Sequence, residues 1–314
     1  MNIREKALSD FKIKTKDSSQ QEKGLYKVSI ENGEYILETD VFLFYHQLDR
    51  PIRKVIGNVK VAKECVSLLG APCEVSGNFD CSFCKNLESL EGAPERIGGN
   101  FDCSCCRSLK SLRGAPCFVG GNFLSLWCDG LENLEGSPNQ IGGNFNCSVC
   151  AGLKNLRGAP LRIKGEFDCS NCENLESLDG SPQQIKGDFI CSRCLNLKTL
   201  EGAPQEISGD FDCSECSSLR SLVGSPKVIH GNFWCSGCES LIDLTGAPDI
   251  IEGDFNCSEC DQLKTLHGAP QEIVGDFNCS ECINLKNREE APQKVGGEFN
   301  YSGCYSLSDG GEDI

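Results

Sequence analysis

The chain has 314 residues and a formal net charge of −16 at pH 7. This charge, and the lack of any basic stripe along the sequence, argue against direct binding to nucleic acid, because phosphates are bound by clustered Lys and Arg. Gly at 34 and Cys at 24 are frequent while Met occurs once, a composition that favours a repetitive chain over an ordinary mixed core.

Neither a catalytic motif nor a membrane span is found in the sequence. The three His residues have no partner spacing that suggests a triad, and there is no HExxH and no phosphate loop, so we expect no enzyme activity and no cofactor. The first twenty residues lack an apolar stretch long enough for a signal peptide, and no later segment approaches a membrane span. We therefore expect a chain of a reducing cytoplasm.

Residues 1–56 do not repeat. Within them, GLYKVSIENGEYILETDVFLFY contains two alternating runs joined at Glu31-Asn32-Gly33, which predicts a β-hairpin because Asn-Gly readily adopts a type I′ turn. The first turn of a repeat array would otherwise expose its core. We interpret the hairpin, with a weak half-repeat around Gly57-Asn58-Val59, as a cap; a small separate binding module is the alternative.

From there on a 22-residue unit repeats eleven times without slippage. Each unit has a Pro seven positions before its Phe, usually within Gly-Ala-Pro or Gly-Ser-Pro, which fixes a turn at one corner. The repeated Phe residues are Phe79, Phe101, Phe123, Phe145, Phe167, Phe189, Phe211, Phe233, Phe255, Phe277 and Phe299. The constant spacing predicts turns of identical cross-section.

The apolar positions of one unit predict a short strand around the Phe. In the second unit we expect one set of side chains to point inward, namely Ile97, Phe101, Cys103, Cys106, Leu109 and Leu112. One unit cannot bury this set alone, but eleven stacked units can, at about 4.8 Å per turn. The predicted fold is mainly β, a solenoid of eleven 22-residue turns about 50 Å long.

These residues resemble a known family. In the second unit, Phe101, Cys103, Cys106 and Leu109 match the pattern LxxLxLxxCxxL of cysteine-type leucine-rich repeats, and the match recurs from Phe79 to about Leu307. The words GAPxxIGGxFxCS are similar to short repeats of phage and bacterial proteins, which implies a bacterial cytoplasm, or a virion if a phage encodes the chain. One departure is that the first leucine slot holds Gly, Lys, Ser or His. The resemblance, over about four-fifths of the chain, implies a binding scaffold without catalysis.

Nine units carry Cys-x-x-Cys, a spacing that elsewhere indicates zinc. Here the repeat favours packed thiols, because free Cys behaves as a small buried hydrophobe whose thiol can donate to a turn carbonyl. Ser125 and Tyr301 replace the inner Cys without any change of spacing, which a metal ligand would not tolerate. Metal or iron–sulfur binding and disulfides stay open as alternatives. Four cysteines lie outside the two columns and are the reactive candidates: Cys65, Cys73, Cys105 and Cys117.

The residues on either side of each Phe are expected to form two outward columns. Ten of these residues are acidic and none is basic. Like charges on adjacent strands repel, so such a face costs stability unless Asn ladders, screening or a partner offset it. Partner binding and mere solubility both remain open explanations for this face.

Three apolar residues, Leu124, Ile190 and Trp234, interrupt these columns, and Leu126 and Trp127 follow in the same unit as Leu124. Large apolar side chains beside charges are typical of interface anchors, although they could equally lie beneath a loop or at a self-contact. The predicted partner-binding residues are Leu124, Leu126, Trp127, Ile190, Trp234, Asp80, Asp102, Asp168, Asp188, Asp210, Asp212, Asp254 and Asp276.

A second pair of columns shows a different charge pattern. Glu88 and Glu91 are followed one unit later by Lys110 and Arg113, and then by Glu132 and Glu135, so that signs alternate from turn to turn. Neighbouring turns should attract there, by a few tenths of a kcal/mol per pair. We interpret these columns as a solvated face with lateral ion pairs.

The expected organisation is a cap or small β module at 1–56, the solenoid at 57–306 and an acidic tail at 307–314. The function predicted is a non-enzymatic scaffold that binds a protein, most readily one with a basic surface, through the acidic strand face. One alternative is a structural rod that assembles end to end or joins a larger particle. Another is a nucleic-acid mimic that blocks a DNA- or RNA-binding protein.

Overall fold

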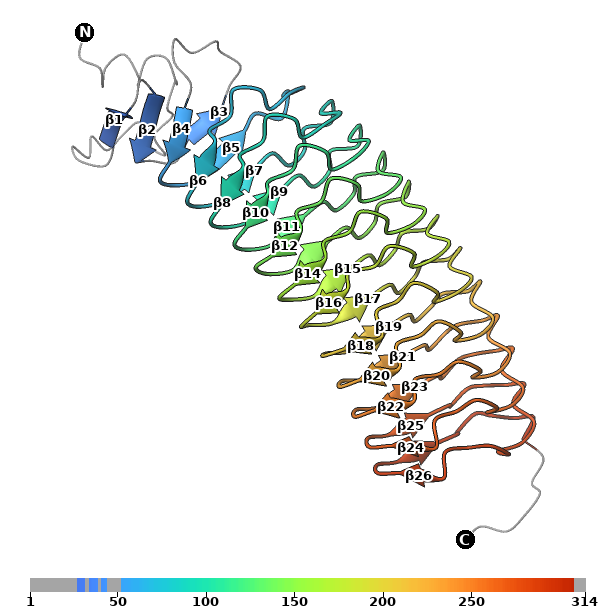
Figure 1. Ribbon diagram of the computed structural model, residues 1–314. Helices are drawn as coiled ribbons and strands as arrows, with labels where there is room; N and C mark the ends of the chain where they lie inside the picture. Colours follow the sequence, from blue (N-terminus) through green and yellow to red (C-terminus); the bar gives the residue numbers. More distant parts are fainter. Residues whose placement is uncertain (1–26, 32–33, 39–40, 44–51, 308–314) are drawn as a thin grey trace, which may run out of the picture.

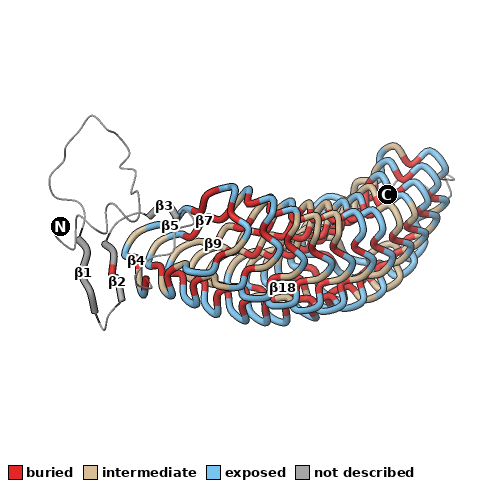
Figure 2. Tube along the Cα trace, turned by 90° about the horizontal axis from the view of Figure 1, so that it is seen from above, coloured by how far each residue is buried: buried red, intermediate tan, exposed pale blue. Residues whose placement is uncertain are grey.

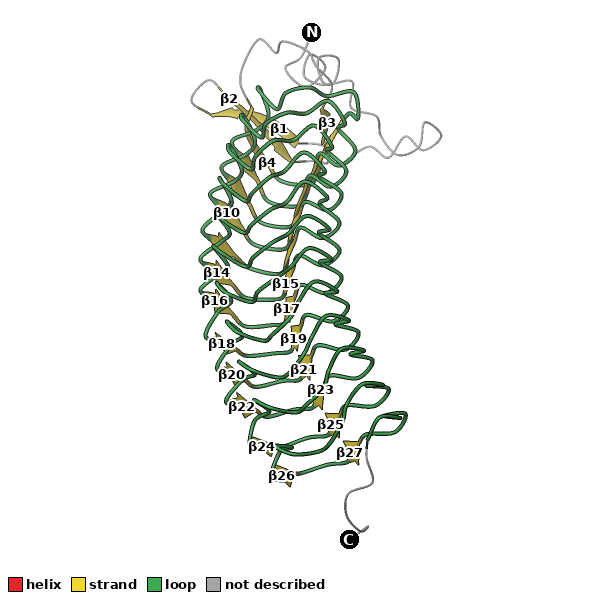
Figure 3. Ribbon diagram, turned by 90° about the vertical axis from the view of Figure 1, so that its right-hand side faces the viewer, coloured by secondary structure: helices red, strands yellow, loops and turns green. Residues whose placement is uncertain are grey.

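The computed structural model describes residues 27–31, 34–38, 41–43 and 52–307. This part of the chain is a slightly curved rod of stacked turns and contains no helix (Figure 1). Strands form two rows along one side of the rod, and the opposite side consists of loops (Figures 1 and 3). The predicted fold class, an all-β solenoid of 22-residue turns, is confirmed.

The N-terminal strands are longer than the others: β1 (Lys27–Glu31), β2 (Glu34–Glu38), β3 (Val41–Leu43), β4 (Ile52–Val55) and β5 (Val59–Val61). β1 and β2 pair antiparallel, with Glu31 opposite Glu34, as the predicted hairpin requires, while the Asn32-Gly33 turn itself lies outside the described residues. Parallel pairing begins with β2 against β4 and with β3 against β5. The stacking of strands therefore extends back before residue 57.

The first row consists of two-residue strands before the Gly-rich corner: β6 (Glu74–Val75), β8 (Arg96–Ile97), β10 (Phe118–Val119), β12 (Gln140–Ile141), β14 (Arg162–Ile163), β16 (Gln184–Ile185), β18 (Glu206–Ile207), β20 (Val228–Ile229), β22 (Ile250–Ile251), β24 (Glu272–Ile273) and β26 (Lys294–Val295). Nine strands form one sheet in the order β1-β2-β4-β6-β8-β10-β12-β14-β16. The row continues as β18-β20-β22 and β24-β26.

The second row carries the repeated Phe: β7 (Phe79–Asp80), β9 (Phe101–Asp102), β11 (Phe123–Leu124), β13 (Phe145–Asn146), β15 (Phe167–Asp168), β17 (Phe189–Ile190), β19 (Phe211–Asp212), β21 (Phe233–Trp234), β23 (Phe255–Asn256), β25 (Phe277–Asn278) and β27 (Phe299–Asn300). With β5 and β3 they form one 13-stranded sheet, parallel throughout. Each Phe lies directly opposite the Phe of the next turn.

The core is a set of identical columns inside the rod. Ten of the eleven Phe rings are fully buried, and consecutive ring centroids are 5.0 to 5.8 Å apart. The Cys, Leu and Ile columns are buried beside them in every inner turn (Figure 2). Each buried Phe contributes about 1.5 to 3 kcal/mol, so a ladder repeated through the rod stabilises it along its whole length.

Glycine fills the corner two positions after the second Leu in nine units, from Gly92 to Gly268, and Glu290 takes this position in the tenth unit. Gly114 has φ of 85°, and a Cβ there would lie 2.5 Å from the backbone nitrogen of Glu91 in the preceding turn. A side chain at Gly114 would therefore combine a strained conformation with a clash against the preceding turn. The repeated Gly-Ala-Pro therefore closes one corner and allows the turns to stack in contact.

Candidate functional site

The strand face is the surface formed by the residues immediately before and after each Phe of the second row. We call them the preceding column, from Asn78 to Glu298, and the following column, from Asp80 to Asn300. All eight predicted Asp residues lie on this face. Most of these side chains are half-buried, and Asp276 is exposed.

In the preceding column, each Asn or Asp holds the next turn. Its Oδ1 accepts the backbone N–H of the residue 22 positions later, as Asn78 does from Asn100 at 2.8 Å. Donor–acceptor distances along the column are 2.7 to 3.1 Å. Asp188, Asp210, Asp254 and Asp276 all act in this way. Their carboxylates therefore accept hydrogen bonds from backbone N–H groups that have no partner in the parallel sheet.

Glu166 is the exception within this column. Its backbone N–H is bound by Asn144, but the structure contains no bond from the Asp188 N–H to the longer Glu166 side chain. Burial raises the pKa of the Glu166 carboxyl, and the neighbouring Asp168 and Asp188 charges raise it further. The ladder is thus interrupted once, at the only Glu that has an Asp after it in the column.

In the following column, each Asn or Asp caps the loop after its own strand. The Oδ1 of Asp102 accepts the backbone N–H of Ser104 at 2.8 Å, an Asx turn. Eight turns make this bond, at 2.8 to 3.0 Å. Asp80, Asp102, Asp168 and Asp212 are the predicted residues among them. The sequence signal is Asx-x-Ser after eight of the eleven Phe residues, which predicts an Asx turn as directly as it suggests an acidic surface.

Leu124, Ile190 and Trp234 occupy the three positions of the following column that carry no such oxygen. All three are half-buried and lie in register between Asx residues, Leu124 between Asp102 and Asn146 for example. Three turns separate Leu124 from Ile190, and two more separate Ile190 from Trp234. These turns lack the local hydrogen bond of the other eight and place an apolar side chain on a polar face instead.

Leu126 and Trp127 lie beside the strand face and not on it. Trp127 occupies the corner after β11, where its φ is 57° and its side chain is 46% exposed. Leu126 is half-buried between this corner and Leu124. The five predicted apolar residues therefore belong to two surfaces that meet at the third turn.

Cysteines fill the core as packed thiols. From Cys106 onward, the Sγ of each outer Cys donates to the backbone carbonyl oxygen of the inner position one turn before, for example Cys106 to Cys81 at 3.3 Å. All 24 cysteines are free, and all but Cys73, Cys105 and Cys117 are buried. Burial raises the pKa of Cys103 to about 12. Within the described residues, no three His, Cys, Asp or Glu side chains are placed to hold a metal ion.

The interpretation of Cys65 as lying outside the core columns is wrong. It is buried, and its N–H donates to Ala62 just as Leu87 donates to Cys84, so it occupies the first Leu slot of the half-repeat. The unit around Val59 is two residues shorter than the others. Counting back from Phe79 by a fixed 22 residues therefore does not align Cys65 with the Leu positions of the later units.

The lateral ion pairs predicted for the alternating columns are confirmed. Nζ of Lys154 is 3.1 Å from Glu132, and the Arg113 and Arg157 guanidinium groups contact Glu135 and Asp179 at 2.9 and 2.7 Å. All these groups are largely exposed, so each pair contributes at most about 1 kcal/mol.

One feature that sequence reasoning missed is a column of strained corners. The residue four positions after the Phe has a positive φ in every repeat, although nine of the eleven are not Gly: Phe83, Cys105, Trp127, Val149, Asn171, Arg193, Glu215, Glu259 and Glu281. A left-handed conformation is costly for such residues, and bulky ones adopt it rarely. The sequence carries one signal for this conformation, because two units have Gly at this position, Gly237 and Gly303.

No helix in the described part of the chain is long and apolar enough to cross a membrane. No protein-family model and no curated protein matches the sequence. Among solved structures, a leucine-rich repeat protein from Bacteroides ovatus is similar, at 13% identity and a TM-score of 0.37, over 90% of this chain and 91% of that one.

Proposed function

We propose that the chain is a non-enzymatic binding scaffold whose strand face binds a protein with a basic surface. The observation that carries this proposal is the replacement of the Asx oxygen by Leu124, Ile190 and Trp234. Each replacement gives up a local hydrogen bond worth about 0.5 to 1.5 kcal/mol. The fold gains nothing from losing this bond in three turns when it keeps it in the other eight. Binding a partner does explain the loss, because apolar side chains on the surface contribute to a contact.

The spacing of these residues fits a single partner. Five turns separate Leu124 from Trp234, about 24 Å at 4.8 Å per turn, which is within the width of an ordinary protein interface. Asp102 flanks Leu124, Asp168 and Asp212 flank Ile190, and Asp212 also flanks Trp234. Apolar anchors surrounded by carboxylates match a partner that carries apolar side chains among Lys and Arg.

The carboxylates can serve both the fold and a partner. In the Asx turn only one oxygen of Asp102 or Asp212 accepts the Ser N–H. The second oxygen is then able to accept from a Lys or Arg, for which Arg is suited by its planar donors. The structural role of these Asp residues therefore does not remove them from the binding surface.

The test is a variant, called the repaired variant, in which the three turns regain the Asx residue of the other eight. Replacing Leu124, Ile190 and Trp234 together by Asn restores the Asx oxygen, so we expect the variant to fold and to melt at the native temperature or above. A matched control places Asn at three exposed apolar residues elsewhere, Leu161, Val223 and Ile242. Both are compared with the native chain in pull-downs from nuclease-treated lysate of the source organism, at low and high salt.

A partner retained by the native chain and by the control, lost by the repaired variant and weakened by salt is the expected result. The captured protein is then purified, and its affinity for the three chains is measured directly. Capture of the same protein by the repaired variant, or of none by the native chain, would contradict the proposal.

A further inference from the structure

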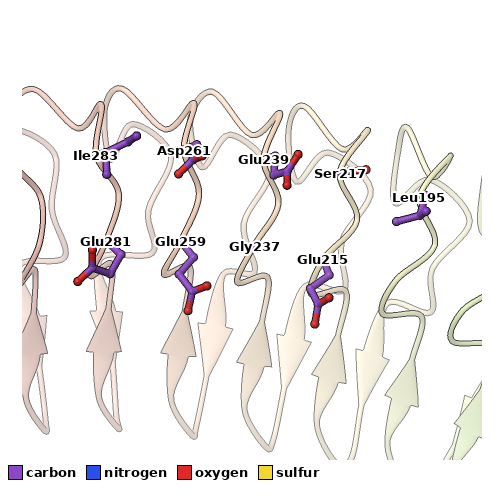
Figure 4. A pocket seen from close by; sticks show the side chains of 9 residues that line it. All are labelled: Leu195, Glu215, Ser217, Gly237, Glu239, Glu259, Asp261, Glu281 and Ile283. Carbon is purple, nitrogen blue, oxygen red and sulfur yellow. The ribbon is translucent and has the colours of Figure 1, made fainter.

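Apart from the strand face, the strongest surface feature is the corner edge. We define it by the residues four and six positions after each Phe, together with Lys63 of the shorter unit around Val59, which aligns with Lys85 because Cys65 aligns with Leu87. Figure 4 shows the part of this edge between Leu195 and Ile283, where the labelled side chains lie along one edge of the rod. The chemical character of this edge changes along the rod, between its N-terminal and C-terminal halves.

The N-terminal half of the edge is basic and apolar apart from Asp129, which pairs with Arg107 at 3.5 Å. Phe83 and Trp127 are 47% and 46% exposed, although each is in a left-handed conformation that costs about 1 to 2 kcal/mol for a side chain of this kind. Lys63 lies over the Phe83 ring, with Nζ 4.8 Å from its centroid. Lys85 is exposed beside it. Exposed aromatic rings at strained positions do not serve the fold, because Asn171 and Gly237 fill the same corner at less cost.

The C-terminal half of the edge is an acidic groove of about 610 Å³ (Figure 4). Five of its lining residues are acidic: Glu215, Glu239, Glu259, Asp261 and Glu281. Glu215 is paired with Arg193 at 2.8 Å. Among the described residues, the other four have no ion pair with Lys or Arg, and no three of them are placed to hold a metal ion. Leu195 and Ile283 line the two ends of the groove.

The two halves are therefore complementary to each other and lie on one edge of the same rod. We propose that two copies of this chain associate antiparallel along the corner edge, with the basic and aromatic half of each copy against the acidic groove of the other. The two copies are related by a two-fold axis. Each contact is therefore made twice, and the assembly closes at two chains.

The repeat also sets the register. Lys63 and Glu281 each lie five turns from the turn of Asn171, on opposite sides. A two-fold axis at Asn171 places Lys63 opposite Glu281, and Phe83 with Lys85 opposite Glu259 and Asp261. The paired edge would extend over about ten turns, roughly 48 Å. A parallel arrangement in register would instead bring acidic groove against acidic groove, which the net charge of −16 makes worse.

This inference does not depend on the proposed function, since the anchors Leu124, Ile190 and Trp234 lie on the strand face. It assigns Trp127 to self-association. A failure of either proposal can be recognised separately, because the strand-face variant leaves the corner edge unchanged.

The first experiment measures the mass of the full chain by sedimentation equilibrium over a wide concentration range. The native chain should approach the mass of two chains and stop there. Replacing Phe83 and Trp127 by Asn, the residue found at the same corner in Asn171, relieves the backbone strain and so keeps the fold. We expect this variant to weaken association at least tenfold.

Charge reversal tests the pairing itself. Glu259→Lys with Glu281→Lys should weaken association at least tenfold, and adding Lys63→Glu with Lys85→Glu should restore it to within about threefold of native. The control is Glu201→Lys with Glu289→Lys, which makes the same change of net charge at exposed sites away from the edge. This control should not weaken association.

Three results would overturn the proposal. One is a native chain that stays monomeric at every concentration. Another is a series of species that grows beyond two chains, which indicates a staggered head-to-tail contact. The third is a reversal whose effect the second pair of substitutions does not compensate. Circular dichroism of every variant shows that a loss of association is not a loss of fold.

Discussion

The carboxylate of Asp188 accepts the backbone N–H of Asp210, the residue one turn further on, at 2.8 Å. The same bond recurs along the preceding column and is made by Asn and Asp alike. An acidic column of this kind is thus a structural ladder that uses one oxygen per turn, and neither the charge nor the second oxygen is needed for it.

Replacing Asp188 by Ala removes this acceptor and leaves the Asp210 amide without a protein partner. We expect a local loss of about 1 kcal/mol, which is about fivefold faster hydrogen exchange at Asp210. Asp188→Asn keeps the oxygen and should exchange at the native rate. Equal exchange in the Ala variant would show that the ladder contributes nothing to stability. Exchange is preferred to global unfolding because stacked repeats open locally.

Shortening Glu166 should complete the ladder. Asn at this position has the chain length of the other members, so its Oδ1 can accept the Asp188 N–H, and it also removes a carboxyl whose pKa burial and two neighbouring Asp residues raise. We expect Glu166→Asn to slow exchange of the Asp188 amide several-fold and to raise the melting temperature. A lower melting temperature would mean that Glu166 has another role.

The pKa of Asp80 should depend on Lys60. Burial alone would raise this pKa, but hydrogen bonds from Lys60 and Ser82 and the Lys60 charge outweigh it, so the pKa lies below the ordinary value of 3.8. A lowered pKa stabilises the folded state above about pH 4, and this contribution is lost as the pH falls through the pKa of the folded chain. Lys60→Met should raise the Asp80 pKa, as carboxyl NMR titration can measure. An unchanged pKa would leave the Ser82 bonds as the dominant cause.

Thiol labelling of the native chain should be confined to few sites. Cys73 and Cys117 are exposed, whereas Cys103 is buried with its pKa raised to about 12. We expect iodoacetamide at pH 8 to modify Cys73 and Cys117 first, then the partly buried Cys105, whose pKa burial also raises. Mass spectrometry of digests locates the modified residues. Early modification of the inner columns would contradict the packed-thiol core, and denaturant should expose all 24 cysteines.

Several features could be read from the sequence because the repeat converts them into columns. An exact period of 22 places every Phe over the next Phe, so the buried ladder and the buried Cys and Leu columns follow from spacing alone. The lateral pairs such as Arg157 with Asp179 follow for the same reason. The buried position of Cys65 was not predicted, because the first unit is shorter and does not follow the 22-residue period.

The sequence by itself determined the solenoid, its core and its outward columns, because a period of 22 repeats every contact. Only the tertiary structure decided how the outward residues are used. Whether Asp102 is a free charge or a cap depends on a bond of 2.8 Å to Ser104, and whether Trp127 lies on the strand face depends on a backbone φ of 57°. The sequence period predicts which side chains are buried. It does not predict the length of a particular hydrogen bond or the backbone angle that directs an exposed side chain. For the same reason the groove between Glu259 and Glu281 is visible only once the turns are stacked.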